Sequence, residues 1–207
     1  MNNRFVWNFE INNDKPLVIP SAGSIEQDQK RWESRYFWPD EQIITLHGLP
    51  DSFLKLSQYN IKNRKDIYFL LPNADYNLKI RHEKLFYKPI LMKYPHAIAY
   101  DKKIKLEEQA LGVKLPGCEE KDAQTLIARI RAEGVQVSVE KEALIYQFDT
   151  TPITKIELAR LYIANKTYFT ASIESKALLL VDSIARQLLG HLPASDYVTF
   201  LKEILSQ

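Results

Sequence analysis

The sequence predicts an α+β fold in which antiparallel strands are followed by two helices at the C-terminal end. Apolar and polar residues alternate in most segments between about residues 4 and 100, and again between 135 and 175. Short turns join neighbouring segments, and strands joined in this way must pair antiparallel. After residue 175 a helical period replaces the alternation. We expect one domain, 1–207, with a helical insertion at about 101–134 and C-terminal helices at about 175–207.

Six strands are predicted before residue 100. In the first of them Phe5, Trp7 and Phe9 fall on one face, because side chains two residues apart point the same way. Pro39 and Pro72 end two of the later segments, since proline cannot donate to a sheet ladder. The predicted strands are 4–11, 32–38, 42–47, 59–71, 76–82 and 85–91.

The middle of the chain changes to a helical pattern and then returns to strands. A short helix is expected at 104–111, before Gly112, and a longer one at 119–133, before Gly134. Strands are then predicted at 135–139, 143–148, 153–163 and 167–173. The last two helices are expected around 178–188, where Gly190 follows as a C-cap, and at 196–204.

Composition excludes several classes of protein. Hydrophobic residues make up 45% and charged residues 26% of the chain, which is typical of a globular protein rather than a disordered or fibrous one. The longest apolar run, Ala177 to Val181, is too short to span a membrane, and the first residues lack the apolar stretch of a signal peptide. A single cysteine, Cys118, cannot form an internal disulfide. We therefore expect a soluble, cytoplasmic protein.

Positive charge is concentrated in the middle of a nearly neutral chain. The formal net charge is +2, yet residues 55–105 hold 12 Lys or Arg and only 4 Asp or Glu. This bias indicates either a localised anion site or an ordinary solvated basic face.

The charged residues share strand faces. Lys62, Arg64 and Asp66 lie on one face of their strand, and Lys79 and Arg81 share a face of the next. Such faces fit either one open sheet with a solvated side or a closed barrel with charges inside. In a barrel, Lys and Arg would hold phosphate oxygens, while carboxylates would hold Mg²⁺ or Mn²⁺.

Several common motifs are absent from the sequence. No Gly-Lys-Ser/Thr, GxGxxG or HExxH pattern occurs, and one cysteine excludes a paired-cysteine zinc site. His82 falls on the face of Leu78 and Ile80, which predicts a packed histidine rather than a ligand.

Short motifs in a fixed order resemble the CYTH superfamily of triphosphate tunnel metalloenzymes. They are Lys65-Asp-Ile-Tyr-Phe-Leu-Leu-Pro, Asn77-Leu-Lys-Ile-Arg81, Leu85-Phe-Tyr-Lys88, Val139-Glu-Lys141, Lys155-Ile-Glu157 and Tyr168-Phe-Thr-Ala-Ser-Ile-Glu174. The resemblance spans roughly residues 30–175 and implies an eight-stranded antiparallel tunnel barrel with helices packed outside. Members of this family hydrolyse or cyclise triphosphates with a divalent metal held by carboxylates.

The resemblance also implies site residues, although the acidic motifs depart from the family pattern. Arg31-Trp-Glu33-Ser-Arg35 stands where an E-x-E-x-K motif is expected, and Ser172-Ile-Glu174 where E-x-E is expected. The implied catalytic, metal-binding carboxylates are Glu33, Glu157 and Glu174. Fewer carboxylates, with Arg31 beside them, lower the affinity for a cation. The implied phosphate-binding residues are Arg35, Arg64, Lys79, Arg81, Lys88, Lys62 and Lys141.

Three functions remain open at this point. We favour a phosphohydrolase that uses Mg²⁺ or Mn²⁺ on inorganic tripolyphosphate or on a nucleoside or thiamine triphosphate. The alternative is a weak or inactive CYTH-like module that binds a nucleotide or polyphosphate without chemistry. The third is an open sheet that binds single-stranded nucleic acid through Phe86, Tyr87 and Tyr68.

The expected partner is a small phosphate-rich molecule. We expect no membrane partner and no nucleic acid except a 5′-triphosphate end. The C-terminal helices are expected to pack on the barrel or, alternatively, to form a homodimer contact.

Overall fold

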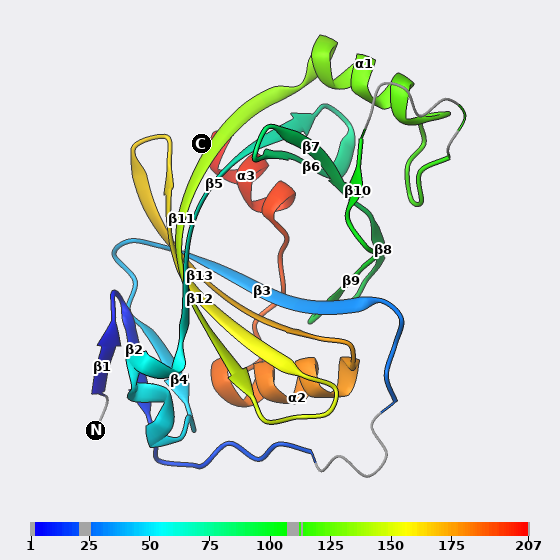
Figure 1. Ribbon diagram of the computed structural model, residues 1–207. Coiled ribbons are helices and arrows are strands. Elements are labelled where there is room, and N and C mark those ends of the chain that lie inside the picture. Colours follow the sequence, from blue (N-terminus) through cyan, green and yellow to red (C-terminus); the bar gives the residue numbers. More distant parts are fainter. Residues whose placement is uncertain (1–2, 21–25, 107–111, 113, 207) are drawn as a thin grey trace.

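The computed structural model describes residues 3–20, 26–106, 112 and 114–206 (Figure 1). Its larger sheet has ten strands, and every neighbouring pair in it is antiparallel. These strands are β3 (Arg31–Pro39), β5 (Asn60–Leu71), β6 (Ala74–Arg81), β7 (Lys84–Lys88), β8 (Ile90–Lys93), β9 (Ile98–Tyr100), β10 (Ile104–Lys105), β11 (Val135–Phe148), β12 (Thr154–Ile163) and β13 (Lys166–Ser175).

A smaller sheet and three α-helices complete the described fold. The small sheet contains β1 (Asn3–Val6), β2 (Phe9–Asn12) and β4 (Ile44–His47), and two short 3₁₀ turns follow it at Asp51–Leu54 and Leu56–Gln58. The helices are α1 (Ala123–Glu133), α2 (Leu178–Leu189) and α3 (Tyr197–Leu205). The predicted α+β class is confirmed, and antiparallel pairing holds throughout the large sheet, whereas β2 and β4 of the small sheet pair parallel. No helix in the described ranges is long and apolar enough to cross a membrane.

The large sheet is strongly curled. Its strand order is β10-β7-β6-β5-β11-β12-β13-β3-β9-β8, so β7 and β8 stand near opposite ends of that order. Along the chain, however, only Pro89 separates them. Pro89 is where the chain leaves its pairing with β6 and begins to pair with β9. The sheet therefore has ten strands rather than the expected eight, and the two edges of the curl are joined by one bent segment.

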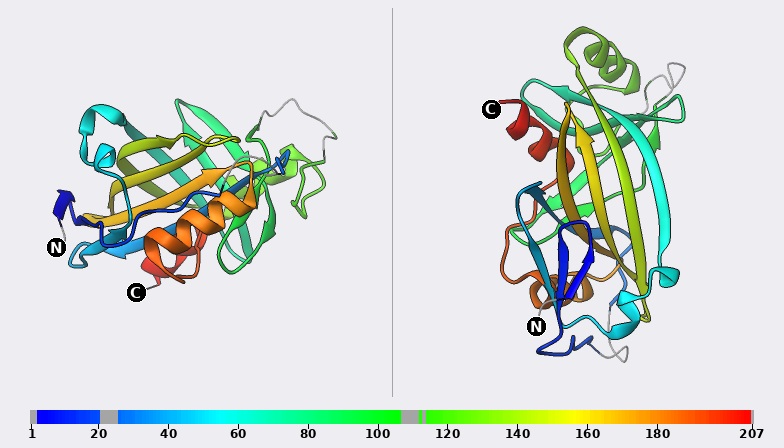
Figure 2. Two further views of the ribbon diagram at one scale, coloured as in Figure 1. Left: turned by 90° about the horizontal axis from the view of Figure 1, so that it is seen from below. Right: turned by 90° about the vertical axis from the view of Figure 1, so that its left-hand side faces the viewer.

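The outer face of the curl is covered by apolar elements. Figures 1 and 2 show α2 lying along β3 and β13, with the small sheet nearby. Val181, Ile184 and Leu188 of α2 are buried in one core with residues of β3, β13 and the small sheet. A second outer core is formed by α1 with residues of β5, β6 and β7. These two helices pack outside the sheet, as predicted.

Helix α3 packs on the concave inner face instead, which corrects the prediction that all helices lie outside. Phe37 of β3 is two residues from Arg35 and therefore points the same way. Its ring stacks on Phe200 of α3, with centroids 4.0 Å apart. Tyr68 of β5 likewise stacks on Tyr197, at 5.2 Å. The apolar part of the inner face is thus filled by α3, and the polar part is left open.

Several predicted elements have different boundaries in the structure. Segment 4–11 is a hairpin rather than one strand, because Trp7 turns the chain with φ of 48°. Segments 135–139 and 143–148 form the single strand β11. The helix predicted at 119–133 begins at Ala123, because the Asp122 side chain accepts a hydrogen bond from the Thr125 amide as N-cap.

The segment after residue 97 also differs from the prediction. Ile104 and Lys105 pair with β7 as strand β10, so the predicted helix does not begin there. The rest of that predicted helix, 107–111, lies outside the described residues. His82 is exposed in the β6–β7 turn with φ of 49°, rather than packed in the core.

Candidate functional site: a basic cavity on the inner face

The open part of the inner face is a cavity of about 710 Å³. Eleven Lys or Arg side chains and four carboxylates line it, a formal excess of seven positive charges. Its size lies in the range typical of small-molecule sites. All ten predicted site residues are among the lining: Glu33, Glu157, Glu174, Arg35, Arg64, Lys79, Arg81, Lys88, Lys62 and Lys141.

The strand register explains why distant motifs meet here. Arg64 on β5 lies opposite Lys141 on β11, and Ile145 farther along β11 lies opposite Glu157 on β12. Glu174 on β13 lies opposite Glu33 on β3. Residues that face each other across a pair point to the same side of the sheet, so alternate positions on successive strands converge on one face.

A chain of alternating charges forms the deep part of the cavity. Glu33 accepts hydrogen bonds from Arg35 Nε at 2.6 Å and from Lys88 Nζ at 3.0 Å. Arg35 also donates to Glu157 Oε1 at 3.2 Å, and Lys141 Nζ donates to the same oxygen at 2.8 Å. Glu33, Arg35 and Lys141 are each at least nine-tenths buried. Each deep carboxylate is therefore shared between two cations.

These charge pairs fix the ionisation of the carboxylates. Burial alone would raise the pKa of Glu33, but the charges of Lys88 and Arg35 hold it well below its usual range. For Glu157, burial is opposed by Lys141 and Arg35, which together lower the pKa to about 2. Both groups are ionised at neutral pH, and the deep cations keep their partners.

Asp66 organises a second group of cations. It accepts a hydrogen bond from Arg81 Nε at 2.6 Å and one from Lys79 Nζ at 3.3 Å. Lys79 also donates to the Tyr68 hydroxyl at 3.2 Å. Burial lowers the pKa of Lys79 to about 7, although the charge of Asp66 opposes this shift. Asp66 thus orients two basic neighbours, Lys79 and Arg81.

The outer part of the cavity is lined by cations whose positive charge is not balanced by neighbouring carboxylates. Lys62 and Arg64 are half-buried, and Lys102, Lys103 and Lys155 are exposed. Within the described ranges none of these five forms an ion pair, although Lys103 lies over the Phe86 ring at 5.1 Å. Burial lowers the pKa of Lys103, and the charges of Arg81 and Arg64 lower it further. Uncompensated like charges in a concave site attract an anion.

The carboxylates do not fit a resident divalent metal. Glu33 and Glu157 are occupied by two cations each, and Glu174 Oε1 accepts from Arg31 at 2.6 Å. No group of three or more His, Cys, Asp or Glu side chains that could hold a metal ion exists among the residues that the structure describes. Mg²⁺ and Mn²⁺ prefer several oxygen ligands, and here each of the three carboxylates is paired with at least one positively charged side chain. Binding of Mg²⁺ or Mn²⁺ stays a prediction from the resemblance.

The aromatic residues predicted to stack on nucleic-acid bases are not available for stacking. Tyr68 is 2% exposed and Tyr87 is 1% exposed. Only Phe86 is partly exposed, and Lys103 covers its ring. Stacking needs an open ring face, so an open-sheet nucleic-acid surface is not what these residues form.

Sequence reasoning missed several lining residues. Lys102 and Lys103 lie in the β9–β10 connection, and Lys155 begins β12. Tyr197 comes from α3, and its ring lies under the Arg35 guanidinium at 4.9 Å. Asn77 shares a strand face with Lys79 and could have been found from that parity. No sequence signal places a terminal helix inside the curl.

Comparisons with solved structures find six similar chains, among them the two that follow. No family model and no curated protein matches the chain. A candidate adenylate cyclase from Bacillus halodurans has a TM-score of 0.43 at 7% identity, over 83% of this chain and 98% of its own. A Pyrococcus horikoshii OT3 protein has a TM-score of 0.34 at 13% identity, over 84% and 88%. Both scores lie below 0.5, so the function is argued from the cavity.

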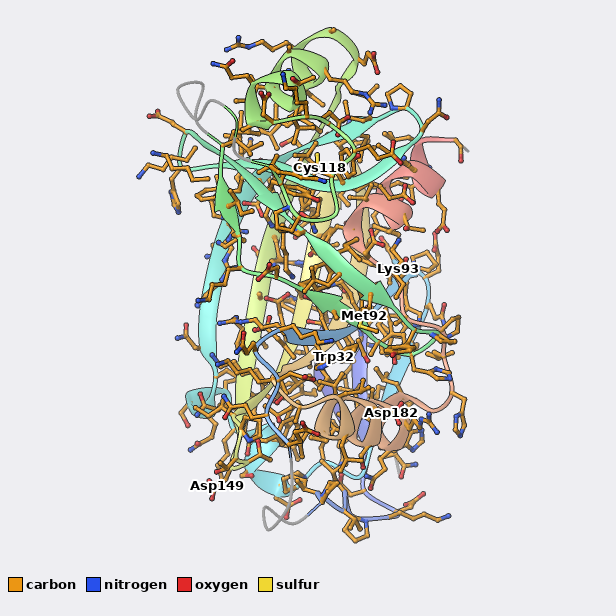
Figure 3. All side chains as sticks on the ribbon, turned by 90° about the vertical axis from the view of Figure 1, so that its right-hand side faces the viewer. Trp32, Met92, Lys93, Cys118, Asp149 and Asp182 are labelled. Carbon is orange, nitrogen blue, oxygen red and sulfur yellow. The ribbon has the colours of Figure 1, made fainter. Side chains whose placement is uncertain are left out.

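Figure 3 views the molecule from the side of β8, where Met92 and Lys93 are labelled. Lys93 donates to Asp196, the N-cap of α3, at 3.0 Å. Cys118 near α1 and Asp182 on α2 are labelled on opposite sides of β8 in this view. Neither of them lines the basic cavity.

Proposed function

We propose that the protein binds a phosphate-rich anion of the triphosphate class in the basic cavity, and that this binding does not require a divalent metal. The observation that supports it is the excess of seven positive charges over one cavity of about 710 Å³. Lys and Arg form strong charge-assisted hydrogen bonds with phosphate oxygens. A triphosphate carries enough negative charge to neutralise several of the cations that have no internal partner.

The closed, eight-stranded form of the sheet belongs to the same proposal. If β7 and β8 are counted as one strand bent at Pro89, and β9 and β10 as its partner strand, the pairings run in a complete ring of eight. The Asp101 amide donates to the Pro89 carbonyl at 3.1 Å between the two halves. This ring, with charges inside, supports the resemblance to the CYTH superfamily.

Metal-dependent hydrolysis remains the second candidate. It is favoured by one observation, that Glu33, Glu157 and Glu174 all line the same cavity as the cations. Their pairing with Arg and Lys speaks against a resident metal. This pairing does not bear on a metal ion that enters the cavity already bound to the substrate's phosphates. The experiment below separates metal-independent binding from metal-dependent hydrolysis.

Isothermal titration calorimetry with tripolyphosphate tests the proposal. Binding is expected in EDTA, with about the same affinity as in Mg²⁺. Arg64→Gln should weaken it by about tenfold, the effect of losing one charge-assisted bond. Lys65→Gln is the matched control, because Lys65 is the next residue of β5, points to solvent and pairs with Glu140.

Phosphate release should be measured in the same samples. Release that requires Mg²⁺ or Mn²⁺ and stops in EDTA would favour the metal-dependent hydrolase instead. If the folded protein binds neither tripolyphosphate nor a nucleoside triphosphate, the proposed binding function is contradicted.

A further inference from the structure

Two buried polar groups at the inner end of the cavity lack a hydrogen-bond partner among the described residues. They are Asn77 Oδ1 and the Tyr197 hydroxyl. Asn77 is 4% exposed and Tyr197 is 8% exposed, and both residues line the basic cavity. Buried polar atoms almost always have a partner, so two such atoms in one cavity indicate a partner supplied from outside the chain.

Both groups lie at the end of the cavity that α3 closes. Asn77 is two residues from Lys79 on the inner face of β6, toward Ala74, whose carbonyl accepts from Lys202 of α3. Tyr197 is the first residue of α3. The cations without ion pairs lie on β5, β12 and the β9–β10 connection. The cavity thus has an outer part rich in free cations and an inner end with neutral polar groups.

The Tyr197 ring is held rigidly. One face stacks on Tyr68 with centroids 5.2 Å apart and planes at 19°. The Arg35 guanidinium lies 4.9 Å from the ring, and Phe37 packs on it edge-on at 5.2 Å. A ring fixed on several sides leaves its hydroxyl in a fixed position, as in a preorganised binding group.

The chemistry of the two groups defines what they bind. An amide oxygen only accepts hydrogen bonds, whereas a phenol hydroxyl both donates and accepts. A fully ionised phosphate chain only accepts, so it leaves Asn77 Oδ1 unsatisfied. A hydroxyl or amino group offers the missing donor. We therefore propose that Asn77 and Tyr197 form a second subsite, which recognises a hydrogen-bond-donating organic group at the end of a phosphorylated ligand.

This inference rests on the proposed function and narrows it. The ligand is an organic triphosphate, such as a nucleoside triphosphate, rather than inorganic polyphosphate. The phosphates occupy the cation-rich part of the cavity, and the organic group reaches its inner end.

The test compares calorimetric affinities for tripolyphosphate and the four ribonucleoside triphosphates. At least one nucleotide is expected to bind about tenfold more tightly than tripolyphosphate, the gain from satisfying one or two buried groups. Tyr197→Phe removes only the hydroxyl, and Asn77→Leu removes the amide at similar volume. Each should weaken nucleotide binding about tenfold more than it weakens tripolyphosphate binding. Tyr94→Phe, an exposed tyrosine outside the cavity, is the control and should keep the wild-type preference.

Thermal unfolding of the free protein gives a readout that does not depend on which ligand is chosen. Removing an unpaired buried polar group relieves a cost, so Tyr197→Phe should melt at the same temperature as wild type or higher. A clearly lower melting temperature would mean that the hydroxyl already has a protein partner, which would overturn the inference.

The remaining outcomes are also decisive. If tripolyphosphate binds as tightly as every nucleotide, or if both variants keep the nucleotide preference, the second subsite is wrong and the proposed function stands. If neither tripolyphosphate nor any nucleotide binds, the proposed function fails, and the second subsite fails with it.

Discussion

Individual carboxylates in the cavity and directly behind its wall hold the cations in position. Glu33 and Glu157 each hold two cations deep in the site, and Asp66 holds Lys79 and Arg81. Without these anions the buried cations would repel one another and turn toward solvent. The internal pairs therefore set the positions of the deep cations before any ligand arrives, which reduces the entropy lost on binding.

The same pairs make the folded protein sensitive to acid. The pKa of Glu157 is about 2 in the folded protein and 4.5 in a free side chain. A carboxyl group whose pKa is lower in the folded than in the unfolded protein stabilises the folded state. This stabilisation is complete above the pKa of the unfolded state and is lost as the pH falls through the pKa of the folded state. The free energy of unfolding should thus decrease from about pH 4.5 toward pH 2.

Urea unfolding across this pH range measures the effect. Glu157→Gln should flatten the pH dependence, and at neutral pH it should lower stability by about 3–5 kcal/mol, because Arg35 and Lys141 lose a shared anion. Glu41→Gln, at an exposed carboxylate outside the cavity, is expected to keep the wild-type slope. A wild-type slope in the Glu157 variant would contradict this account.

Among the elements, α3 connects stability with the site. Its N-cap Asp196 accepts hydrogen bonds from the Val198 and Thr199 amides and from Lys93 Nζ. The next residue is Tyr197, which lies under Arg35. The cap therefore holds both the start of the helix and one wall of the cavity.

A comparison of two helix caps tests this connection. Asp196→Ala should lower stability by about 1–2 kcal/mol and also weaken tripolyphosphate binding, because Tyr197 and Arg35 lose their fixed positions. Asp122→Ala removes the cap of α1, which lies outside the cavity, and should cost about 1 kcal/mol with unchanged binding. Denaturant unfolding and calorimetry on both variants give the two quantities. Equal losses of affinity in both variants would show a general effect of instability.

The elements also show how far the sequence could predict the fold and the candidate site. Alternation fixes which residues share a face, and antiparallel register keeps that parity from strand to strand. The ten site residues that the resemblance implied come from seven strands, and all of them line one cavity. The alternation of apolar and polar residues does not indicate where a strand bends. The sequence therefore did not predict that the chain changes its pairing partner at Pro89. The apolar stripe of α3 predicted a helix, but not that it packs inside the curl, and this is why Tyr197 was missed.

Over the whole molecule, positive charge is concentrated in the cavity and the compensating negative charge lies elsewhere. The net charge is only +2, while the cavity has an excess of seven positive charges, so the rest of the chain carries a negative excess. A concave, partly enclosed site of one sign concentrates field lines and draws in anions even when the protein is nearly neutral. Electrostatic attraction should therefore dominate ligand affinity but contribute little to solubility or to nonspecific binding.

Ionic strength tests this separation directly. Raising NaCl from about 50 to about 500 mM shortens the Debye length severalfold and should weaken tripolyphosphate binding by at least about tenfold. The melting temperature of the free protein should change little, because the deep ion pairs are buried and poorly screened. Arg64→Gln should reduce the salt dependence of tripolyphosphate binding, because the variant has one fewer unpaired cation in the cavity. Lys65→Gln should keep the salt dependence of the wild type. If tripolyphosphate affinity were independent of salt, the positive excess in the cavity would not be what attracts the ligand.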